Sequence, residues 1–292
     1  IKNSKNMFEN SKDDQRIDIS FQKIEELLKK SNNQELLNYV SNLHNADIAD
    51  IIQNLDEDNR SKFIFYIKDF FDPEILTYLS EGLKEEVIDK LDIEKLASNV
   101  SELDTDDAVD VVEDLEQSDK EVLLRYVSPI DRKLIEEGLN YPEDSAGRLM
   151  QRKFVAIHHT WNVGNTIDYL RKQTDNLPED FYDVYLIDND NIVTGIVPLG
   201  RLMSSNREVK LDKIKNKVTR LINVLTDQEE VAFQFNKYAM VSAPVVDKQN
   251  QIIGSITVDD VVDVIEEERE EDILKLGGVG HTDIFEATIN TI

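Results

Sequence analysis

The segment QIIGSITVDDVVDVIEEEREEDILKLGG occupies residues 251–278 and combines three patterns. It begins with a short apolar stretch, turns at Gly254, and continues into a helix that starts near Thr257. Seven carboxylates and one arginine then follow between Asp263 and Asp272. Carboxylates at helical spacing repel one another unless a cation lies among them. The segment therefore predicts a strand that leads into an acidic helix, whose charge requires a cationic partner.

A related copy of this pattern lies 59 residues earlier in the chain, with Asp188 matching Asp247 and Gly195 matching Gly254. Each copy reads as a strand, a helix, two strands around an Asn-rich turn, and a second helix. Such a pattern predicts an α/β fold in which a small mixed sheet is covered by helices, with the two copies forming a pseudo-twofold pair. The predicted strands are 153–157, 183–188 and 192–197, then 220–225, 242–247 and 252–257, and the predicted helices are 162–173, 199–203, 227–237 and the segment from 258 onward.

The region before this pair is a helical repeat. Apolar residues recur every 12 positions from Leu43 to Leu139, and a second apolar series follows nine residues after most members. Within one repeat the apolar spacing is helical, as in residues 48–55. A helix of two to three turns cannot bury its apolar stripe alone, so neighbouring helices must stack. The sequence therefore predicts an all-α superhelical solenoid of short helices, most of which is scaffold.

One repeat is unusually acidic. Residues 104–119 contain eight carboxylates and no basic residue. Asp106 and Asp110 are four residues apart and therefore project from one helix face. Asp107 fits a capping or helix-dipole role in the first turn, but Asp110 lies deeper in the helix. Two interpretations stay open, namely a solvated acidic face and a face that binds cations.

Composition excludes several classes of function. The formal net charge is −27, which opposes binding to nucleic acid because phosphate binding requires Lys and Arg to displace counterions. There is no Cys, so disulfides and thiolate metal sites are excluded. No apolar run approaches the about 20 residues of a membrane span, and no signal peptide is visible. No catalytic motif is present either, so we do not expect an enzyme.

The phrase APVVDKQNQIIGSITVDDVVDVI, at 243–265, resembles the second half of a cystathionine-β-synthase (CBS) domain, and DVYLIDNDNIVTGIVPLGRLM, at 183–203, resembles its partner. The preceding solenoid, EDSAGRLM at 143–150 and EEREEDILKLGG at 267–278 narrow the resemblance to the cytosolic part of MgtE-type magnesium channels and transporters. The resemblance covers residues 21–278.

This resemblance implies a regulatory domain that senses intracellular magnesium, forms a homodimer through its CBS pairs, and lies at the cytoplasmic face of the cell membrane. A connecting, or plug, helix would lead into a transmembrane pore domain that is absent from this sequence, so we expect the chain to be a fragment. The implied domains are a disordered tail at 1–20, the helical domain at 21–140, CBS domains at 141–206 and 207–266, and the start of the plug helix at 267–292.

The resemblance also implies metal ligands. Magnesium prefers hard oxygen ligands and keeps several waters, so one or two carboxylates on each surface are enough. Manganese and calcium are the alternative ions, and the alternative for each residue is a solvated helix carboxylate. The predicted magnesium ligands are Asp106, Asp110, Asp227, Asp247, Asp259 and Asp263.

The second CBS copy contains Gly254, Thr257 and Asp260 in the spacing of nucleotide-binding CBS copies, which predicts a site for ATP or AMP. The first copy departs from this pattern, with Pro198 and Arg201 at the matching positions. Capping of the following helix would also account for Thr257 and Asp260. The alternatives to a magnesium sensor are therefore a CBS module that senses adenine nucleotides and a structural scaffold without a ligand.

Overall fold

The computed structural model describes residues 12–30, 33–101, 103–113, 115–173, 177–178, 181–217, 220–262, 264–265 and 269, with side chains from residue 21 onward except that of Glu81. The described residues form two compact units. The first contains the residues up to 103 together with 107–135. The second contains residues 104–106 together with those from 136 onward.

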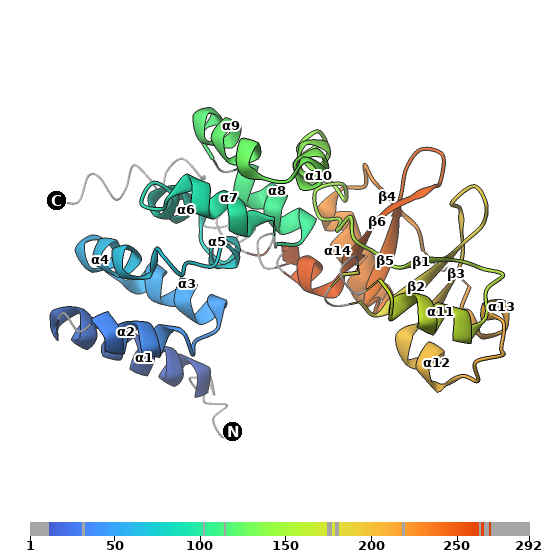
Figure 1. Ribbon diagram of the computed structural model, residues 1–292, viewed down its shortest axis with the longest axis horizontal. Coiled ribbons are helices and arrows are strands. Elements are labelled where there is room, and N and C mark those ends of the chain that lie inside the picture. Colours follow the sequence, from blue (N-terminus) through green and yellow to red (C-terminus); the bar gives the residue numbers. More distant parts are fainter. Residues whose placement is uncertain are drawn as a thin grey trace, which may run out of the picture. The chain divides into compact units, whose positions relative to one another are not determined.

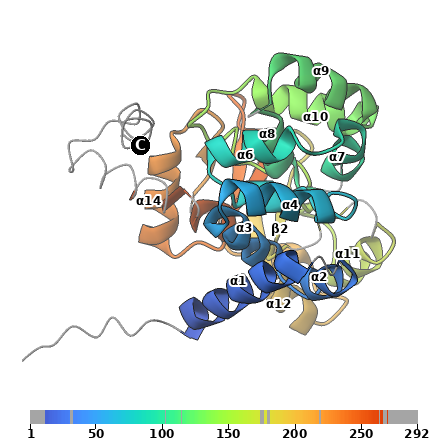
Figure 2. The ribbon, with the colours of Figure 1, turned by 90° about the vertical axis from the view of Figure 1, so that its left-hand side faces the viewer.

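The first unit is an array of short helices (Figure 1). Figure 2 shows α1 and α2 side by side, with α3 and α4 as the next layer, and contacts of α1 with α3 and of α2 with α4 join these layers. This arrangement confirms the predicted solenoid. Its helices are α1 (Lys12–Lys30), α2 (Asn33–Val40), α3 (Asn45–Asn54), α4 (Glu57–Ile67), α5 (Glu74–Thr77), α6 (Glu81–Ile88), α7 (Ile93–Val100), α9 (Gln117–Tyr126) and most of α8 (Thr105–Glu113) and α10 (Pro129–Leu139).

Several of these helices begin at an aspartate cap. The Asp56 carboxylate accepts a hydrogen bond from the N–H of Asn59 at 3.0 Å, and Asp92 accepts one from the N–H of Glu94 at 3.0 Å. Each cap satisfies an N–H group that the helix itself leaves without a partner. The acidic turns between repeats therefore mark where α4 and α7 start.

The predicted apolar stripes form the core of this unit. Burying one such side chain stabilises the fold by about 1.5–3 kcal/mol relative to leaving it exposed. Because most of these helices bury two or more of them, the layers stabilise one another as the repeat pattern requires. The side chains with no exposed surface include Ile51, Ile52, Phe63, Ile64, Leu76, Val87, Val100, Val111, Val112 and Leu123.

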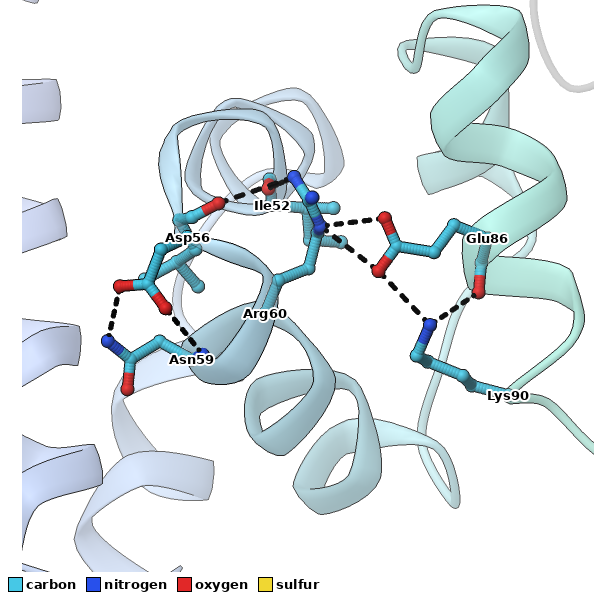
Figure 3. A network of polar contacts seen from close by, with 7 residues as sticks. Ile52, Asp56, Asn59, Arg60, Glu86 and Lys90 are labelled. Carbon is cyan, nitrogen blue, oxygen red and sulfur yellow. Dashed lines mark hydrogen bonds and ion pairs between the residues drawn. The ribbon is translucent and has the colours of Figure 1, made fainter. Parts of the chain in front are cut away.

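A polar network also joins two helices of the first unit (Figure 3). Arg60 of α4 donates to Glu86 of α6, with Nε 3.0 Å from Oε2, and its guanidinium also reaches the carbonyl of Ile52 at 3.4 Å. Lys90 lies 3.0 Å from the same Glu86 carboxylate. Burial raises the pKa of Glu86, but hydrogen bonds from Lys90 and Arg60 outweigh that effect and hold this pKa below its usual value. The network therefore fixes α4 against α6.

The beginning of the chain differs from the prediction. Helix α1 starts at Lys12, inside the range 1–20 that was predicted to be a disordered tail. The polar sequence of residues 12–20 concealed a helix that is continuous with the apolar helical pattern starting near Phe21. Residues 1–11 lie outside the described residues.

The second unit contains two three-stranded sheets, in the order β1-β2-β3 and β4-β5-β6. In each sheet the first strand is parallel and the third antiparallel to the central strand, which confirms the mixed sheets predicted for the two copies. The strands are β1 (Ala156–His158), β2 (Asp183–Ile187), β3 (Val193–Pro198), β4 (Ile222–Asn223), β5 (Ser242–Val246) and β6 (Ile252–Thr257), and the helices are α11 (Val163–Leu170), α12 (Leu199–Ser204), α13 (Leu211–Ile214) and α14 (Gln228–Tyr238), followed by helical residues at 258–262.

The 59-residue offset is visible in the details of the backbone. Asn191 and Asn250 occupy matching turns and both adopt the left-handed region, with φ of 60° and 61°. A register shift also occurs at matching places in the two sheets, between residues 186 and 187 and between residues 245 and 246. Asn tolerates this backbone conformation better than most residues, because its side chain can hydrogen-bond locally. The Asn-rich turns were therefore a sound basis for predicting the hairpins.

The outer parallel strands are shorter than predicted. The strand expected at 153–157 is β1, at 156–158, and the one expected at 220–225 is β4, at 222–223. Single backbone hydrogen bonds continue each pairing, from the N–H of Tyr185 to Val155 and from the N–H of Val224 to Val246. Apolar composition predicted the location of these strands but not the extent of their ladders.

The two sheets share a small core inside the second unit. Tyr185 and Val193 of the first sheet pack with Ile252 of the second. The N–H of Ile252 also donates to the carbonyl of Asn191 at 3.1 Å. The matching hairpins are therefore in direct contact. Across the described part of the chain, no helix is both long enough and apolar enough to cross a bilayer.

Candidate functional site

Helix α8 carries the acidic face that the sequence singled out, and Asp110 on this face has a cationic partner within the first unit. Lys84 of α6 donates to Asp110 Oδ1 at 3.0 Å and to Oδ2 at 2.8 Å. The Lys84 side chain is 9% exposed, whereas that of Asp110 is 46% exposed. A lysine of the protein therefore neutralises one of the predicted metal ligands. The sequence did not point to Lys84, because it lies 26 residues away from Asp110.

Asp106 lies in the part of α8 that belongs to the second unit. Its side chain hydrogen-bonds with Asp260, and burial raises the pKa of Asp260 to about 6. Hydrogen bonds from Thr257 oppose this rise, while the carboxylate of Asp259 adds to it. Two adjacent carboxyl groups resist full ionisation unless a proton or a cation lies with them. Asp260 therefore keeps its proton to a higher pH than an exposed aspartate does.

Thr257 and Asp260 have the geometry of a helix cap. The Thr257 N–H donates to Asp260 Oδ2 at 3.0 Å, and the Thr257 hydroxyl donates to the same oxygen at 2.8 Å. The N–H bond is the reciprocal half of a capping box, in which the side chain of the third helical residue accepts from the backbone N–H of the N-cap residue. The capping interpretation of this pair is therefore sufficient to explain both residues.

Asp227 and Asp247, two more predicted ligands, stabilise local backbone structure. Asp227 caps α14 by accepting from the N–H of Glu229 at 3.0 Å. Asp247 accepts from the N–H groups of Gln249 and Gln251 at 2.8 and 2.9 Å, which closes the hairpin turn. Asp188, at the matching position of the first copy, closes its own turn in the same way. Repetition of this turn in both copies explains Asp247 without a metal.

The remaining predicted ligands are on the helix after β6. Asp259 is exposed, and Asp263 lies outside the described residues. Among the residues that the structure describes, no group of three or more His, Cys, Asp or Glu side chains could hold a metal ion. Among the described residues of the second unit, the structure brings Asp106 close to Asp260, a residue predicted for nucleotide and not for metal.

A narrow cleft lies between the two sheets of the second unit. Its lining includes Asp183, Tyr185, Ser242, Ser255 and Thr257. The Tyr185 hydroxyl lies 2.9 Å from Ser242 Oγ and 2.6 Å from Ser255 Oγ, and Ser242 donates to Asp183 at 2.7 Å. These groups supply donors and acceptors of the kind that recognise a polar small molecule, and apolar residues such as Phe154 and Val155 flank them.

Burial changes the acidity of this cleft. It raises the pKa of Asp183, which a hydrogen bond from Ser242 partly opposes. It also raises the pKa of Tyr185 to about 12, so the phenol stays protonated and can act as a hydrogen-bond donor. No motif in the sequence points to these residues. The one available signal is that Asp183 and Ser242 are 59 residues apart, at the first position of matching strands.

Known proteins are similar to most of this chain. The family described as the MgtE intracellular N domain matches residues 43–144, and the CBS domain family matches residues 218–267. The magnesium transporter MgtE of Thermus thermophilus is 28% identical over 264 residues, which is 89% of this chain and 58% of the relative. The magnesium transporter MgtE of Bacillus subtilis is 27% identical over 262 residues, 89% of this chain and 57% of the relative. This chain therefore spans less than two thirds of these relatives.

Two solved structures are also similar to this chain. The soluble part of a magnesium transporter is 27% identical and has a TM-score of 0.70, covering 86% of this chain and 99% of that one. The cytosolic domain of the Mg²⁺ channel MgtE in complex with ATP is also 27% identical, with a TM-score of 0.74, covering 82% of this chain and 98% of that one. Each match covers more of this chain than either compact unit contains.

Proposed function

We propose that this chain, which carries an MgtE intracellular N domain followed by CBS architecture, is the magnesium-sensing regulatory part of a magnesium transporter. The observation that carries the proposal is the match to the soluble part of a magnesium transporter over 86% of this chain and 99% of that one. The acidic balance of the chain, with 60 Asp and Glu against 33 Lys and Arg, supplies a surface that divalent cations can neutralise.

The proposed mechanism is electrostatic. Without a divalent cation, carboxylates on neighbouring acidic surfaces repel one another, and a cation between them converts repulsion into attraction. Magnesium at such a place needs only one or two carboxylates from each surface, because it keeps several of its waters. The ligand set stays a prediction, and its test uses Asp106, which hydrogen-bonds with Asp260, and Asp259, which is exposed.

The proposal also includes domain boundaries, a homodimer and a place in the cell, which are those that the resemblance implies. We place the domain boundaries near residues 140, 206 and 266, and we infer a homodimer through the CBS pairs. The transporter's own membrane domain is the second partner, which puts this chain at the cytoplasmic face of the membrane. Magnesium binding would then bias the equilibrium between two arrangements of the regulatory part, and the segment after residue 266 would pass that change on.

The test of this proposal is a magnesium titration followed by limited proteolysis. Millimolar magnesium should slow cleavage of the chain, because a cation-stabilised compact state exposes less backbone to protease. Potassium chloride at equal ionic strength is the control for screening. An Asp106→Asn/Asp259→Asn chain should need more magnesium for the same protection. Cleavage rates that do not respond to magnesium would contradict the proposal.

A second candidate function is binding of an adenine nucleotide in the cleft between the sheets. It is favoured by the polar cleft around Tyr185 and by the similar cytosolic domain in complex with ATP. In this account Asp183, Ser242 and Thr257 of the cleft supply hydrogen bonds together with Asp260, which is bonded to Thr257, and the cleft must widen to admit the ligand. This function is compatible with magnesium sensing, because no residue that lines the cleft belongs to α8.

Calorimetry with ATP and with AMP tests this second function. Asp260→Ala should abolish binding if Asp260 contacts the ligand, but this change also removes the capping box. Asp260→Asn is the matched variant, because its amide oxygen can still accept from Thr257 while the negative charge is gone. We expect binding by the original chain and at least about tenfold weaker binding by Asp260→Asn, the loss typical of a charged hydrogen bond. Absence of heat with either nucleotide would exclude this function.

A further inference from the structure

Lys84 is a charged residue in an unusual place. It is 7% exposed, and among the buried residues that the structure describes it is the one with a full charge. Lysine is almost never buried unless a partner neutralises it. Its neighbours on α6 include Val87, which is fully buried, so the helix holds the lysine stem in the core of the first unit. The ammonium is therefore fixed in position by the fold.

The partner of this fixed ammonium is Asp110 of α8. Lys84 Nζ is 3.0 Å from Asp110 Oδ1 and 2.8 Å from Oδ2, so both carboxylate oxygens face the same cation. Lys84 and Asp110 both lie in the first unit, which makes this contact a feature of one compact body. The Asp110 side chain is 46% exposed, so solvent and dissolved ions reach its outer side.

The position of this pair affects any cation that approaches α8. A magnesium ion that binds Asp110 directly must come within about 2.1 Å of an oxygen that already lies beside an ammonium group. The two cations then repel each other across one carboxylate, and the lysine cannot withdraw into water without leaving the core. A mobile surface lysine would impose less of a barrier, because it can turn away into solvent.

We propose that Lys84 is a built-in cation that occupies Asp110 in place of a divalent ion and thereby sets how much magnesium the acidic face of α8 requires. The inference rests on the proposed magnesium-sensing function and adds to it a residue that determines sensitivity. Asp110 is then a structural anion, and the metal response of α8 depends on its other carboxylates, with Asp106 foremost. Lys84 is a positioning residue that acts on magnesium through Asp110.

The experiment is a magnesium titration, with magnesium chloride as the probe and protease protection as the readout, on the chain and on a cycle of variants. Lys84→Met keeps the length and apolar stem of the side chain but removes its charge. We expect it to lower the magnesium midpoint, which is the concentration that gives half of the full protection, by about twofold to fivefold. This factor corresponds to the strength of a partly exposed ion pair. Asp110→Asn alone should leave the midpoint unchanged, and in the Lys84→Met background it should cancel the gain.

Two controls make the result specific. Lys95→Met removes a lysine whose ion pair with Asp69 is exposed on both sides, and it should not change the midpoint. Lys84→Arg keeps the charge and should retain the original midpoint. Circular dichroism of the Lys84→Met/Asp110→Asn chain, where both charges are gone, shows whether a weak response reflects loss of folding.

The outcomes separate this inference from the proposed function. An unchanged midpoint in Lys84→Met, in a chain that responds to magnesium, would overturn the role of Lys84 and leave magnesium sensing intact. A higher midpoint in Asp110→Asn alone would also overturn it, because Asp110 would then be a direct ligand. No response in either the original chain or Lys84→Met overturns both proposals. A response that appears only in Lys84→Met supports masking by Lys84 and contradicts sensing by the original chain.

Discussion

At the scale of single residues, the structure gives three of the six candidate metal ligands a local task. Asp227 caps a helix, Asp247 closes a hairpin, and Asp110 pairs with Lys84. The sequence showed where acids lie at helical spacing, and in the case of Thr257 and Asp260 it also showed the capping alternative. It could not show the Lys84 contact, because a pair that is 26 residues apart depends on how two helices pack.

Asp260 provides a prediction at this scale. Its folded-state pKa of about 6 lies above the ordinary value of 3.8, mainly because of burial. The folded chain therefore binds this proton more tightly than the unfolded chain does, and the resulting stability is present below about pH 4 and lost as the pH rises through 6. Asp260→Asn removes this dependence. Between about pH 4 and pH 7 the unfolding free energy of the original chain should fall by about 2–3 kcal/mol relative to the variant.

Urea unfolding without divalent ions, at a series of pH values, measures this difference. Trp161 is the one tryptophan of the chain and belongs to the second unit, so its fluorescence reports on the unit that contains Asp260. Parallel pH profiles for the two chains would show that Asp260 titrates normally. Millimolar magnesium should flatten the profile of the original chain if the cation takes the place of the proton beside Asp106.

At the scale of helices and strands, the repeat patterns predicted the fold well. The 12-residue period located the buried stripes of the helical unit, and the 59-residue offset located matching turns at Asn191 and Asn250. Local propensity predicted the ends of the helices and strands less well. Residues 12–20 form part of α1 despite their polar sequence, and β4 contains only two residues because its ladder depends on pairing with β5.

The network between α4 and α6 gives a prediction at this scale. Glu86→Gln keeps the shape of the side chain but leaves Arg60 and Lys90 without their shared anion. Both partners are largely buried, so the loss should lower the unfolding free energy by about 1–3 kcal/mol, less than for a fully buried pair. Thermal unfolding followed by circular dichroism measures the loss. Asp69→Asn, which removes the exposed partner of Lys95, should change stability much less, because water screens an exposed ion pair.

A loss for Glu86→Gln that equals the loss for Asp69→Asn would contradict the structural role of the network. The comparison is informative because each substitution neutralises one acid that pairs with a basic residue of another segment. They differ in exposure: the Glu86 side chain is 24% exposed and the Asp69 side chain 59%. Exposure is the property that should decide which ion pair stabilises the solenoid, since water screens the exposed pair.

At the scale of the whole molecule, the net charge of −27 is the property that the proposed function uses. The helical unit and the CBS copies each have an apolar core of their own. The acidic excess is then available to respond to dissolved cations. The sequence predicted this excess and the order of the domains. The geometry of the metal ligands depends on which carboxylates approach one another in the folded chain, and no linear pattern encodes it.

Small-angle scattering during a magnesium titration tests the central claim most directly. Magnesium sensing predicts that the radius of gyration falls in the millimolar range of magnesium chloride, and that potassium chloride of equal ionic strength does not reproduce the change. The Asp106→Asn/Asp259→Asn chain should show the same compaction only at higher magnesium. A radius of gyration that stays constant across the titration, or that follows ionic strength alone, would contradict the claim that this acidic chain binds magnesium and becomes more compact.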